Sequence, residues 1–196
     1  SQIVTDLPDG GDVITYQAAL AEEGVFAVKL SPYLPQPDGP ATVTAWTLLL
    51  SIRTGQPLLL VDAGALTAER TAATTAVAVE LLARPDARRL AVIGLGPLGR
   101  AHVRHVRTGR GFQQVRVYAE SLTPGAIAGL GDVQLVASAE EAVSDADVVL
   151  LCTSAAKPVI DVRELTPGTL VTSISTNAPL AHEVDPRSLL DLDVYA

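Results

Sequence analysis

Several residue types are scarce or missing in this sequence. Its 196 residues include no methionine, a single cysteine (Cys152) and only 4% aromatic residues. One cysteine excludes an intramolecular disulfide and any zinc cluster built from several cysteines, and it fits the cytoplasmic location that we expect. We expect no metal site. No apolar run reaches the roughly 20 residues of a membrane-spanning helix.

The charge balance also excludes some functions. The sequence has 22 acidic and 14 basic residues, a net charge of −8. This argues against nucleic acid or an anionic membrane as a partner, because both require a basic face. Apolar residues make up 48% of the chain, so a packed core is expected, built mainly from alanine, valine and leucine.

The two ends of the chain also carry information. The N-terminus lacks an initiator methionine and shows no signal peptide, and the C-terminus stops where a strand would begin. We therefore expect both ends to be cut.

Residues 1 to about 66 have the texture of short strands joined by turns. Candidate strands cover residues 25–30, 43–51 and 57–62, and residues 53–56 form a turn that suggests an antiparallel pair. Prolines are expected to break the chain between the first two strands: Pro32, Pro35, Pro37 and Pro40.

A helix is expected after these strands, from Arg70 to Ala83. Thr67 is the expected N-cap, and Glu69 would then lie in the first turn, where the helix dipole favours a carboxylate. Pro85 ends the helix, because a residue before proline avoids helical dihedral angles. We place a domain boundary after residue 84.

From Arg89 the pattern changes to alternating strands and helices. The expected strands cover residues 90–94, 115–118, 133–136, 147–152 and 169–174, and the expected helices residues 97–107 and 139–144. Such alternation is typical of a doubly wound parallel sheet. The fold class is therefore α/β: a Rossmann-like domain over residues 85–196, incomplete at its C-terminus, preceded by part of a smaller α+β domain over residues 1–84.

One motif carries chemistry. The run Ile93-Gly94-Leu95-Gly96-Pro97-Leu98-Gly99 contains Gly-x-Gly-x-x-Gly between an apolar strand and a helix, the context of a dinucleotide site. Gly94 permits a tight turn, Gly96 lets a pyrophosphate approach the backbone, and Gly99 lets helix and strand pack closely. The intervening Leu95, Pro97 and Leu98 would line the cofactor. The alternative is a glycine turn in a non-binding domain.

Further cofactor contacts are expected at the ends of other strands. Glu120 follows the second strand of this domain, where a carboxylate accepts from a ribose hydroxyl and repels a 2′-phosphate. NAD is therefore the expected cofactor, with NADP as the alternative. Thr153 and Ser154 follow another strand, at the edge where open α/β sheets bind ligands. Glu120 could also be an ordinary loop carboxylate.

These residues, together with four further segments, resemble the ornithine cyclodeaminase/mu-crystallin family. The segments are Gly55-Gln56-Pro57-Leu58-Leu59-Leu60-Val61-Asp62, Thr67-Ala68-Glu69-Arg70-Thr71-Ala72-Ala73, Ala146-Asp147-Val148-Val149, and Pro167-Gly168-Thr169 with His182-Glu183-Val184-Asp185. The resemblance covers nearly all of the chain. It implies a homodimer of longer chains, in which the smaller domain serves substrate binding and dimerisation.

The resemblance also implies roles for residues outside the glycine motif. Arg70 matches the arginine that binds the substrate carboxylate, and a guanidinium near a helix start suits that task. Lys29 matches an active-site lysine, and apolar surroundings lower the pKa of a lysine and suit it to proton exchange. The alternatives are a surface arginine paired with an acid such as Glu69, and an edge-strand lysine that blocks aggregation.

Asn177 departs from the family pattern. Cyclodeaminases and alanine dehydrogenases have an aspartate there, and an amide cannot act as a general base. The expected function is therefore NAD(P)H-dependent reduction of the C=N bond of a small imino acid, with Asn177 orienting the substrate or nicotinamide. The alternatives are an ornithine cyclodeaminase-type lyase and a non-catalytic crystallin-like binding protein.

Two other residue types have simpler interpretations. His102 and His105 share one face of the expected helix, but no acidic partner is near in sequence, so we expect a solvated face rather than a metal site. Cys152 ends a buried strand and is expected in the core.

Overall fold

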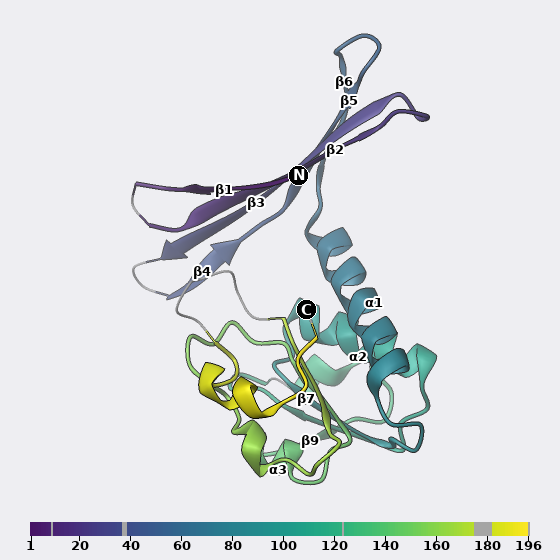
Figure 1. Cartoon of the computed structure of the whole chain (residues 1–196), viewed down its shortest axis with the longest axis vertical. Helices are drawn as coiled ribbons and strands as arrows, with labels where there is room; N and C mark the ends of the chain where they lie inside the picture. The colour runs from purple at the N-terminus through teal and green to yellow at the C-terminus, as the bar shows by residue number, and fades with distance from the viewer. Residues whose placement is uncertain (9, 37–38, 123, 175–181, 196) are drawn as a thin grey trace. The chain divides into compact units, whose positions relative to one another are not determined.

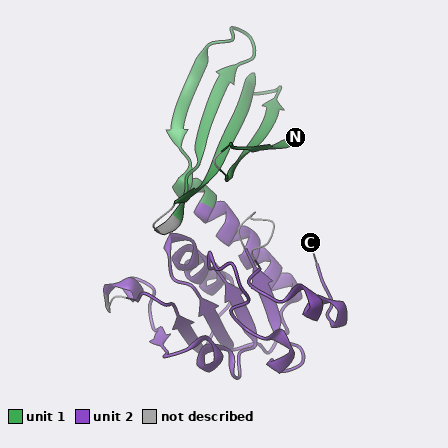
Figure 2. Cartoon of the chain, turned by 90° about the vertical axis from the view of Figure 1, so that its left-hand side faces the viewer, with its two compact units in different colours: residues 1–67 green, residues 68–196 purple. Residues whose placement is uncertain are grey.

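The protein divides into two compact units, residues 1–67 and residues 68–196 (Figure 2). The structure, a computed structural model, describes the whole chain except residues 9, 37–38, 123, 175–181 and 196. The first unit is an antiparallel sheet, and the second is a parallel sheet with helices packed on it (Figure 1). Within the described ranges, no helix is both long enough and apolar enough to cross a bilayer.

The first unit is built from six strands that pair antiparallel. They are β1 (Gln2–Asp6), β2 (Asp12–Leu20), β3 (Val25–Gln36), β4 (Gly39–Val43), β5 (Trp46–Ser51) and β6 (Pro57–Asp62). The order across the sheet is β1-β2-β3-β5-β6, and β4 also pairs with β3. The predicted antiparallel pairing of the strands on either side of residues 53–56 is confirmed.

The prediction that prolines break the chain after residue 30 is wrong for Pro32 and Pro35. Strand β3 continues through both, and Pro32 stands opposite Val13 of β2. Proline lacks only the N–H donor, and the carbonyl oxygen of Pro32 still accepts from the N–H of Thr44, at 3.3 Å. Strands β1 and β2 were not predicted.

The second unit is a five-stranded parallel sheet in the order β11-β10-β7-β8-β9. Its strands are β7 (Arg89–Ile93), β8 (Gln114–Tyr118), β9 (Gln134–Leu135), β10 (Val148–Leu151) and β11 (Leu170–Ser173). Its helices are α1 (Gly64–Leu82, which starts in the first unit), α2 (Pro97–Gly109) and α3 (Ala139–Val143), with 3-10 turns η1 (Pro124–Ile127), η2 (Val162–Glu164) and η3 (Pro186–Asp191). This is the Rossmann strand order, which reverses between β7 and β10. The predicted fold class is confirmed.

Alternate residues of the parallel strands face two separate cores. Leu90 and Val92 of β7 pack with buried residues of α1 and α2, whereas Ala91 and Ile93 pack with buried residues of α3. Both faces of the sheet are therefore covered, which explains the continuous apolar runs in the sequence. Cys152 lies in the first of these cores, and burial raises the pKa of its thiol, as expected for a core residue.

Helix α1 begins earlier than predicted. It starts at Gly64, whose N–H donates to a carboxylate oxygen of Asp62 at 2.7 Å, and the N–H of Thr67 already bonds to the carbonyl of Ala63. Thr67 is therefore not the N-cap, because Asp62 takes that first free donor. Glu69 consequently lies beyond the first turn, where it bonds to His105 (2.6 Å) and pairs with Arg104.

The contacts of α1 also bear on where the chain divides. Val79 and Ala83 belong to the core formed with α2, so the compact units separate between Thr67 and Ala68, before the helix body. The predicted domain boundary after residue 84 assigned the helix to the first domain, because the alternation of strands and helices begins only after it. This boundary between domains stays a prediction.

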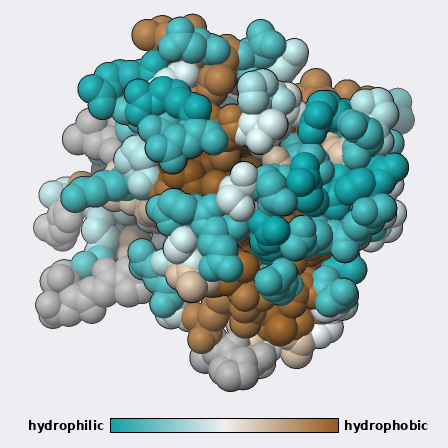
Figure 3. All heavy atoms as spheres, turned by 90° about the horizontal axis from the view of Figure 1, so that it is seen from below, coloured by the Kyte–Doolittle hydropathy of each residue, from teal (hydrophilic) through white to brown (hydrophobic). Residues whose placement is uncertain are grey.

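Apolar side chains are exposed along one edge of the first sheet. In β6, Leu58, Leu59, Leu60 and Val61 are all exposed, although neighbouring residues of a strand point to opposite faces. In the second unit, hydrophobic side chains of α1 such as Leu81 are also exposed. Figure 3 shows one face of the molecule, largely hydrophilic, with hydrophobic side chains gathered in separate areas. Isolated exposed apolar residues are common, whereas contiguous ones mark contact surfaces.

The expectation of a solvated histidine face is wrong for His102, which is fully buried. Its Nδ1 lies 2.7 Å from the carbonyl oxygen of Leu98, and its Nε2 lies 3.0 Å from the hydroxyl of Thr75 in α1. A carbonyl only accepts, so Nδ1 carries the proton, and the neutral ring accepts the Thr75 hydroxyl at Nε2. The burial of His102 was not predicted because its hydrogen-bond partner Thr75 is distant in sequence.

We expect the stability of the second unit to fall as the pH drops below about 6.5. Burial lowers the pKa of His102, so below that pH the unfolded chain binds a proton that the folded chain does not. The free energy of unfolding is therefore full above about pH 6.5 and declines towards the folded pKa. Urea midpoints at about pH 7.5 and about pH 5.5 measure this. His102→Gln should flatten the difference and His105→Gln should keep it; equal slopes in all three proteins contradict the assignment.

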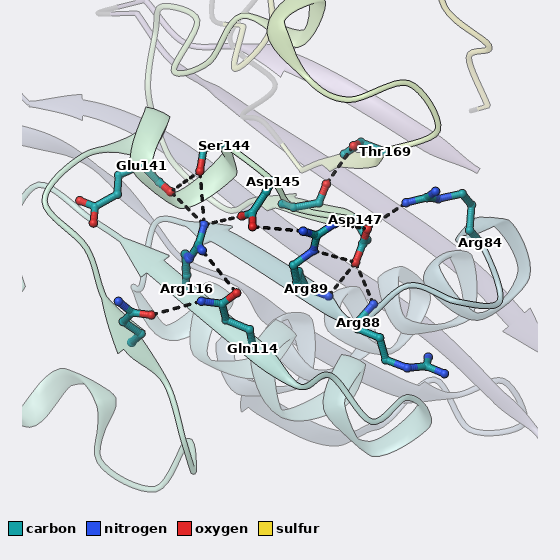
Figure 4. Close-up of polar contacts among 12 residues, drawn as sticks. Arg84, Arg88, Arg89, Gln114, Arg116, Glu141, Ser144, Asp145, Asp147 and Thr169 are labelled. Carbon is teal, nitrogen blue, oxygen red and sulfur yellow. Dashed lines mark hydrogen bonds and ion pairs between the residues drawn. The ribbon is translucent and has the colours of Figure 1, made fainter.

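A buried carboxylate ties together the amino ends of β7 and β10. Asp147 accepts from the backbone N–H groups of Arg88 (2.8 Å) and Arg89 (2.9 Å), and from the guanidinium groups of Arg84 (2.8 Å) and Arg89 (3.1 Å) (Figure 4). Burial alone would raise the pKa of Asp147, but these bonds, chiefly those from Arg89, hold it well below its usual range. The cluster lies at the amino ends of these strands, whereas the glycine turn lies at the carboxyl end of β7.

Asp147→Asn is expected to lower the free energy of unfolding by about 2 kcal/mol. The amide keeps one acceptor oxygen, and its NH₂ group must then face donors that cannot turn away. Urea denaturation followed by circular dichroism measures the loss. Asp191→Asn, an exposed carboxylate, is the matched control. A loss below about 0.5 kcal/mol would show that water replaces the bonds.

Candidate functional site

The glycine turn lies between β7 and α2 and has the strained geometry that glycine permits. Gly94 has a φ of 92°, and its N–H donates to the carbonyl of Tyr118 at 2.8 Å. A Cβ at Gly94 would lie 2.6 Å from the carbonyl oxygen of Cys152, closer than real side chains approach. The turn therefore packs directly on the backbone at the end of β10.

Gly99 keeps α2 close to this turn. A Cβ at Gly99 would lie 2.1 Å from the carbonyl oxygen of Gly94, which leaves no room for any side chain. The two glycines thus fix the path of the chain for reasons internal to the fold.

Gly96 has no such internal reason. It stands before the first residue of α2 with a φ of −65°, which any residue adopts, and a Cβ there meets no described atom within 4 Å. No side chain caps the start of α2 among the residues described, and Pro97 occupies its first position. The open positive end of the helix fits a pyrophosphate, which would approach the Gly96 backbone.

The other residues predicted around the cofactor differ in exposure. Leu95 is buried in the core, Leu98 is half-buried, and Pro97 is exposed. Glu120 is exposed and follows β8, whose last residue Tyr118 stands beside Ile93 of β7. The structure therefore brings Glu120 and the glycine turn to the same edge of the sheet.

Thr153 and Ser154 follow β10 at this edge. The methyl carbon of Thr153 lies 3.1 Å from the Cβ position of Gly94, and its N–H and hydroxyl both bond to Glu183 at 2.7 Å. Ser154 is exposed. Glu183 belongs to the segment His182-Glu183-Val184-Asp185 that carries part of the family resemblance, but nothing in its sequence spacing indicates its partners.

The residues expected to act on the substrate lie on other elements. Lys29 lies in β3 of the first unit, and its Nζ is 5.4 Å from the ring centroid of Tyr16 on β2. The alternative of an edge-strand lysine is wrong, because β3 pairs with β5 at Lys29 as well as with β2. Asn177 lies outside the described residues.

Arg70 lies in α1 and is exposed, without an ion-pair partner among the residues that the structure describes. Because α1 starts at Gly64, Arg70 lies in the second turn of the helix and not in the first turn, as was expected. The alternative that Arg70 pairs with Glu69 is wrong, since Glu69 bonds to Arg104 and His105. No group of three or more metal-ligating side chains occurs in the described part.

The strand order and the glycine turn define the second unit as a Rossmann-like domain. The chain belongs to the ornithine cyclodeaminase/mu-crystallin family, whose sequence profile matches residues 11–196. The predicted resemblance is thereby confirmed.

Two curated relatives illustrate the range of the family. The chain is 52% identical over 200 residues to the NAD(P)H-dependent anabolic L-arginine dehydrogenase DauB of Pseudomonas aeruginosa, matching 100% of this chain and 63% of that protein. It is 27% identical over 187 residues to the ketimine reductase mu-crystallin of Macropus fuliginosus, matching 94% of this chain and 57% of that protein. The chain thus spans about three fifths of the length of these relatives.

Solved structures agree with this placement. The Δ1-pyrroline-2-carboxylate reductase of Thermococcus litoralis, in complex with NADH and L-proline, superposes with a TM-score of 0.81 at 28% identity, over 94% of this chain and 60% of that one. The probable ornithine cyclodeaminase of Bordetella pertussis gives a TM-score of 0.79 at 26% identity, over 96% and 60% of the two chains.

Proposed function

We propose that the protein to which this chain belongs is an NAD(P)H-dependent oxidoreductase that reduces the C=N bond of a small imino acid. The observation that carries the proposal is Gly96, a glycine that the fold itself does not require, at the open start of α2. The names of the relatives from Pseudomonas aeruginosa and Thermococcus litoralis support the same reaction class. Glu120 after β8 favours NAD, with NADP as the alternative.

Each candidate residue has a role in this reaction. The glycine turn would hold the pyrophosphate of NAD(P)H, and the bound cofactor would supply the hydride for the imine carbon. Arg70 binds the substrate carboxylate with two parallel hydrogen bonds. Lys29 gives a proton to the imine nitrogen, so the C=N bond becomes an amine. Asn177 orients the substrate or the nicotinamide through its amide group.

The imine of a basic amino acid is the first substrate to test. The 52% identity to an L-arginine dehydrogenase supports arginine, formed from its 2-oxo acid, ammonia and NAD(P)H with loss of water. The cyclic imine pyrroline-2-carboxylate is the second, on the similarity to the Thermococcus litoralis enzyme. The ornithine cyclodeaminase-type lyase is disfavoured by Asn177, which cannot serve as a base.

We further propose a homodimer located in the cytoplasm, without nucleic-acid or membrane partners. The four exposed apolar residues of β6 lie on both faces of a strand at the edge of the sheet, and a second copy that paired with this edge would cover them. The net charge of −8 and the single buried cysteine support the location and the absence of those partners. Sedimentation velocity of the intact protein tests the dimer.

The reaction is tested by NADH consumption in the intact protein. We expect turnover with NADH and one of these imines, and a rise in KM for the imine of about 100-fold in Arg70→Ala, because a charge-assisted pair is lost. Arg53→Ala, an exposed arginine in the turn before β6, is the matched control. NADH binding without turnover would leave the binding-protein alternative, and ammonia release from ornithine would favour the lyase.

A further inference from the structure

A fully buried carboxylate lies close to the glycine turn. Glu183 is only 1% exposed, yet both oxygens of its carboxylate accept hydrogen bonds. Oε1 accepts from the N–H and the hydroxyl of Thr153, each at 2.7 Å. Oε2 accepts from the hydroxyl of Ser173 at 2.7 Å and the N–H of Ile174 at 3.2 Å.

These bonds join the ends of two neighbouring strands. Thr153 follows β10, Ser173 ends β11 and Ile174 follows it, so one carboxylate connects both strands at their carboxyl ends. The backbone carbonyl of Glu183 also accepts from the N–H of Val159, in the segment that follows Thr153. A buried charge is costly unless it is fully hydrogen-bonded, and this one is.

Only a carboxylate satisfies this arrangement of donors. Each oxygen faces one hydroxyl, which can rotate, and one backbone N–H, which cannot. A glutamine would have to turn its NH₂ group towards either Thr153 or Ile174 and leave that N–H opposed by another donor. An aspartate is one carbon shorter and cannot reach both strands from the same backbone position.

Thr153, which Glu183 holds by two hydrogen bonds, also contacts the glycine turn. Gly94 packs against the carbonyl of Cys152 and the methyl carbon of Thr153. The hydroxyl of Thr153 donates to Glu183 and accepts from the N–H of Ala155, at 3.2 Å, which fixes the direction of the chain after β10. A shift of Thr153 would therefore move the backbone on which Gly94 lies.

We infer that Glu183 is a positioning residue of the dinucleotide site, which holds Thr153 and the end of β11 in the arrangement that the cofactor requires. The inference rests on the proposed function, because it concerns the site where NAD(H) would bind. It assigns to Glu183 no contact with the cofactor: the carboxylate acts through Thr153 and, through it, the glycine turn.

The test compares NADH binding in the intact protein and in Glu183→Gln, by titration of NADH fluorescence. We expect a rise in Kd of about ten-fold or more, the effect of one opposed backbone donor. At saturating NADH and imine, kcat should change much less than KM for NADH. This split would separate positioning of the cofactor from a general loss of active protein.

Asp147→Asn is the matched control, because it changes a buried, fully bonded carboxylate at the opposite edge of the same sheet. It should lower stability while keeping Kd for NADH within about two-fold of the wild type. Thr153→Val should raise Kd, Thr153→Ser should bind more tightly than Thr153→Val, and the double variant Glu183→Gln/Thr153→Val should show less than additive effects. Thr153→Val also tests the inference if Glu183→Gln does not fold.

The outcomes distinguish the inference from the proposal beneath it. If the wild type binds NADH and Glu183→Gln binds it equally well, the inference is wrong and the proposed function stands. Equal weakening in Glu183→Gln and Asp147→Asn also overturns it, because the effect would then be general destabilisation. A wild type that binds neither NADH nor NADPH overturns the proposed function and this inference together.

Discussion

Gly96→Ala is expected to leave the free protein folded and to raise the Kd for NADH about 100-fold. The φ of Gly96 suits alanine, and its Cβ meets no described atom within 4 Å, so the free energy of unfolding should change by less than about 1 kcal/mol. In the complex, the same methyl group would occupy the space through which a pyrophosphate approaches the backbone. Thermal unfolding and NADH titration measure the two effects separately.

Two other glycines provide controls for this variant. Gly111 lies in the loop before β8, where a Cβ also meets nothing within 4 Å, so Gly111→Ala should change neither stability nor NADH affinity. Gly99→Ala should impair both, because its Cβ would lie 2.1 Å from the carbonyl oxygen of Gly94. Unchanged NADH affinity in Gly96→Ala would remove the observation on which the proposed function rests, whereas lost folding would show that Gly96 serves the fold.

The second unit could be predicted closely from the sequence because its strands are buried on both faces. Each strand appears as a continuous apolar run, for example Val148–Leu151, and the helices between them begin with clear signals such as Pro97 and the N-cap Ser138, which accepts from Glu141.

The first unit was harder to predict because its sheet is largely exposed or half-buried. Strands β1 and β2 lack long apolar runs. The prolines of β3 argue against a strand in the sequence, although a proline carbonyl still accepts a hydrogen bond from a neighbouring segment. The true start of α1 was also missed. The N–H of Gly64 donates to the side chain of Asp62, two residues earlier, whereas the sequence pattern favoured Thr67 as the N-cap.

Within the candidate site, residues with a local signature could be predicted and residues with distant partners could not. The glycine turn follows from a seven-residue pattern. Glu183 bonds to Thr153, 30 positions away, and His102 to Thr75, 27 positions away, so no window of sequence reveals them. Both are buried polar groups, whose meaning depends entirely on the donors and acceptors that the fold brings to them.

Lys29→Met is expected to lower kcat for imine reduction about 1,000-fold, within the range that a positioned proton donor contributes. Lys29 lies on an inner strand beside Tyr16, whose ring faces its ammonium group at 5.4 Å, so the side chain is positioned by the sheet. The glycine turn belongs to the other compact unit, and Kd for NADH should therefore stay within about two-fold of the wild type. Steady-state kinetics and NADH titration measure these quantities.

Lys29→Arg separates proton transfer from charge. Arginine keeps a cation that can lie over the ring of Tyr16, but a guanidinium does not release its proton near neutral pH. If Lys29 donates the proton to the imine nitrogen, Lys29→Arg should lose nearly as much kcat as Lys29→Met. If it retains most of the activity, Lys29 acts only through its positive charge, and the proton must come from another group or from water.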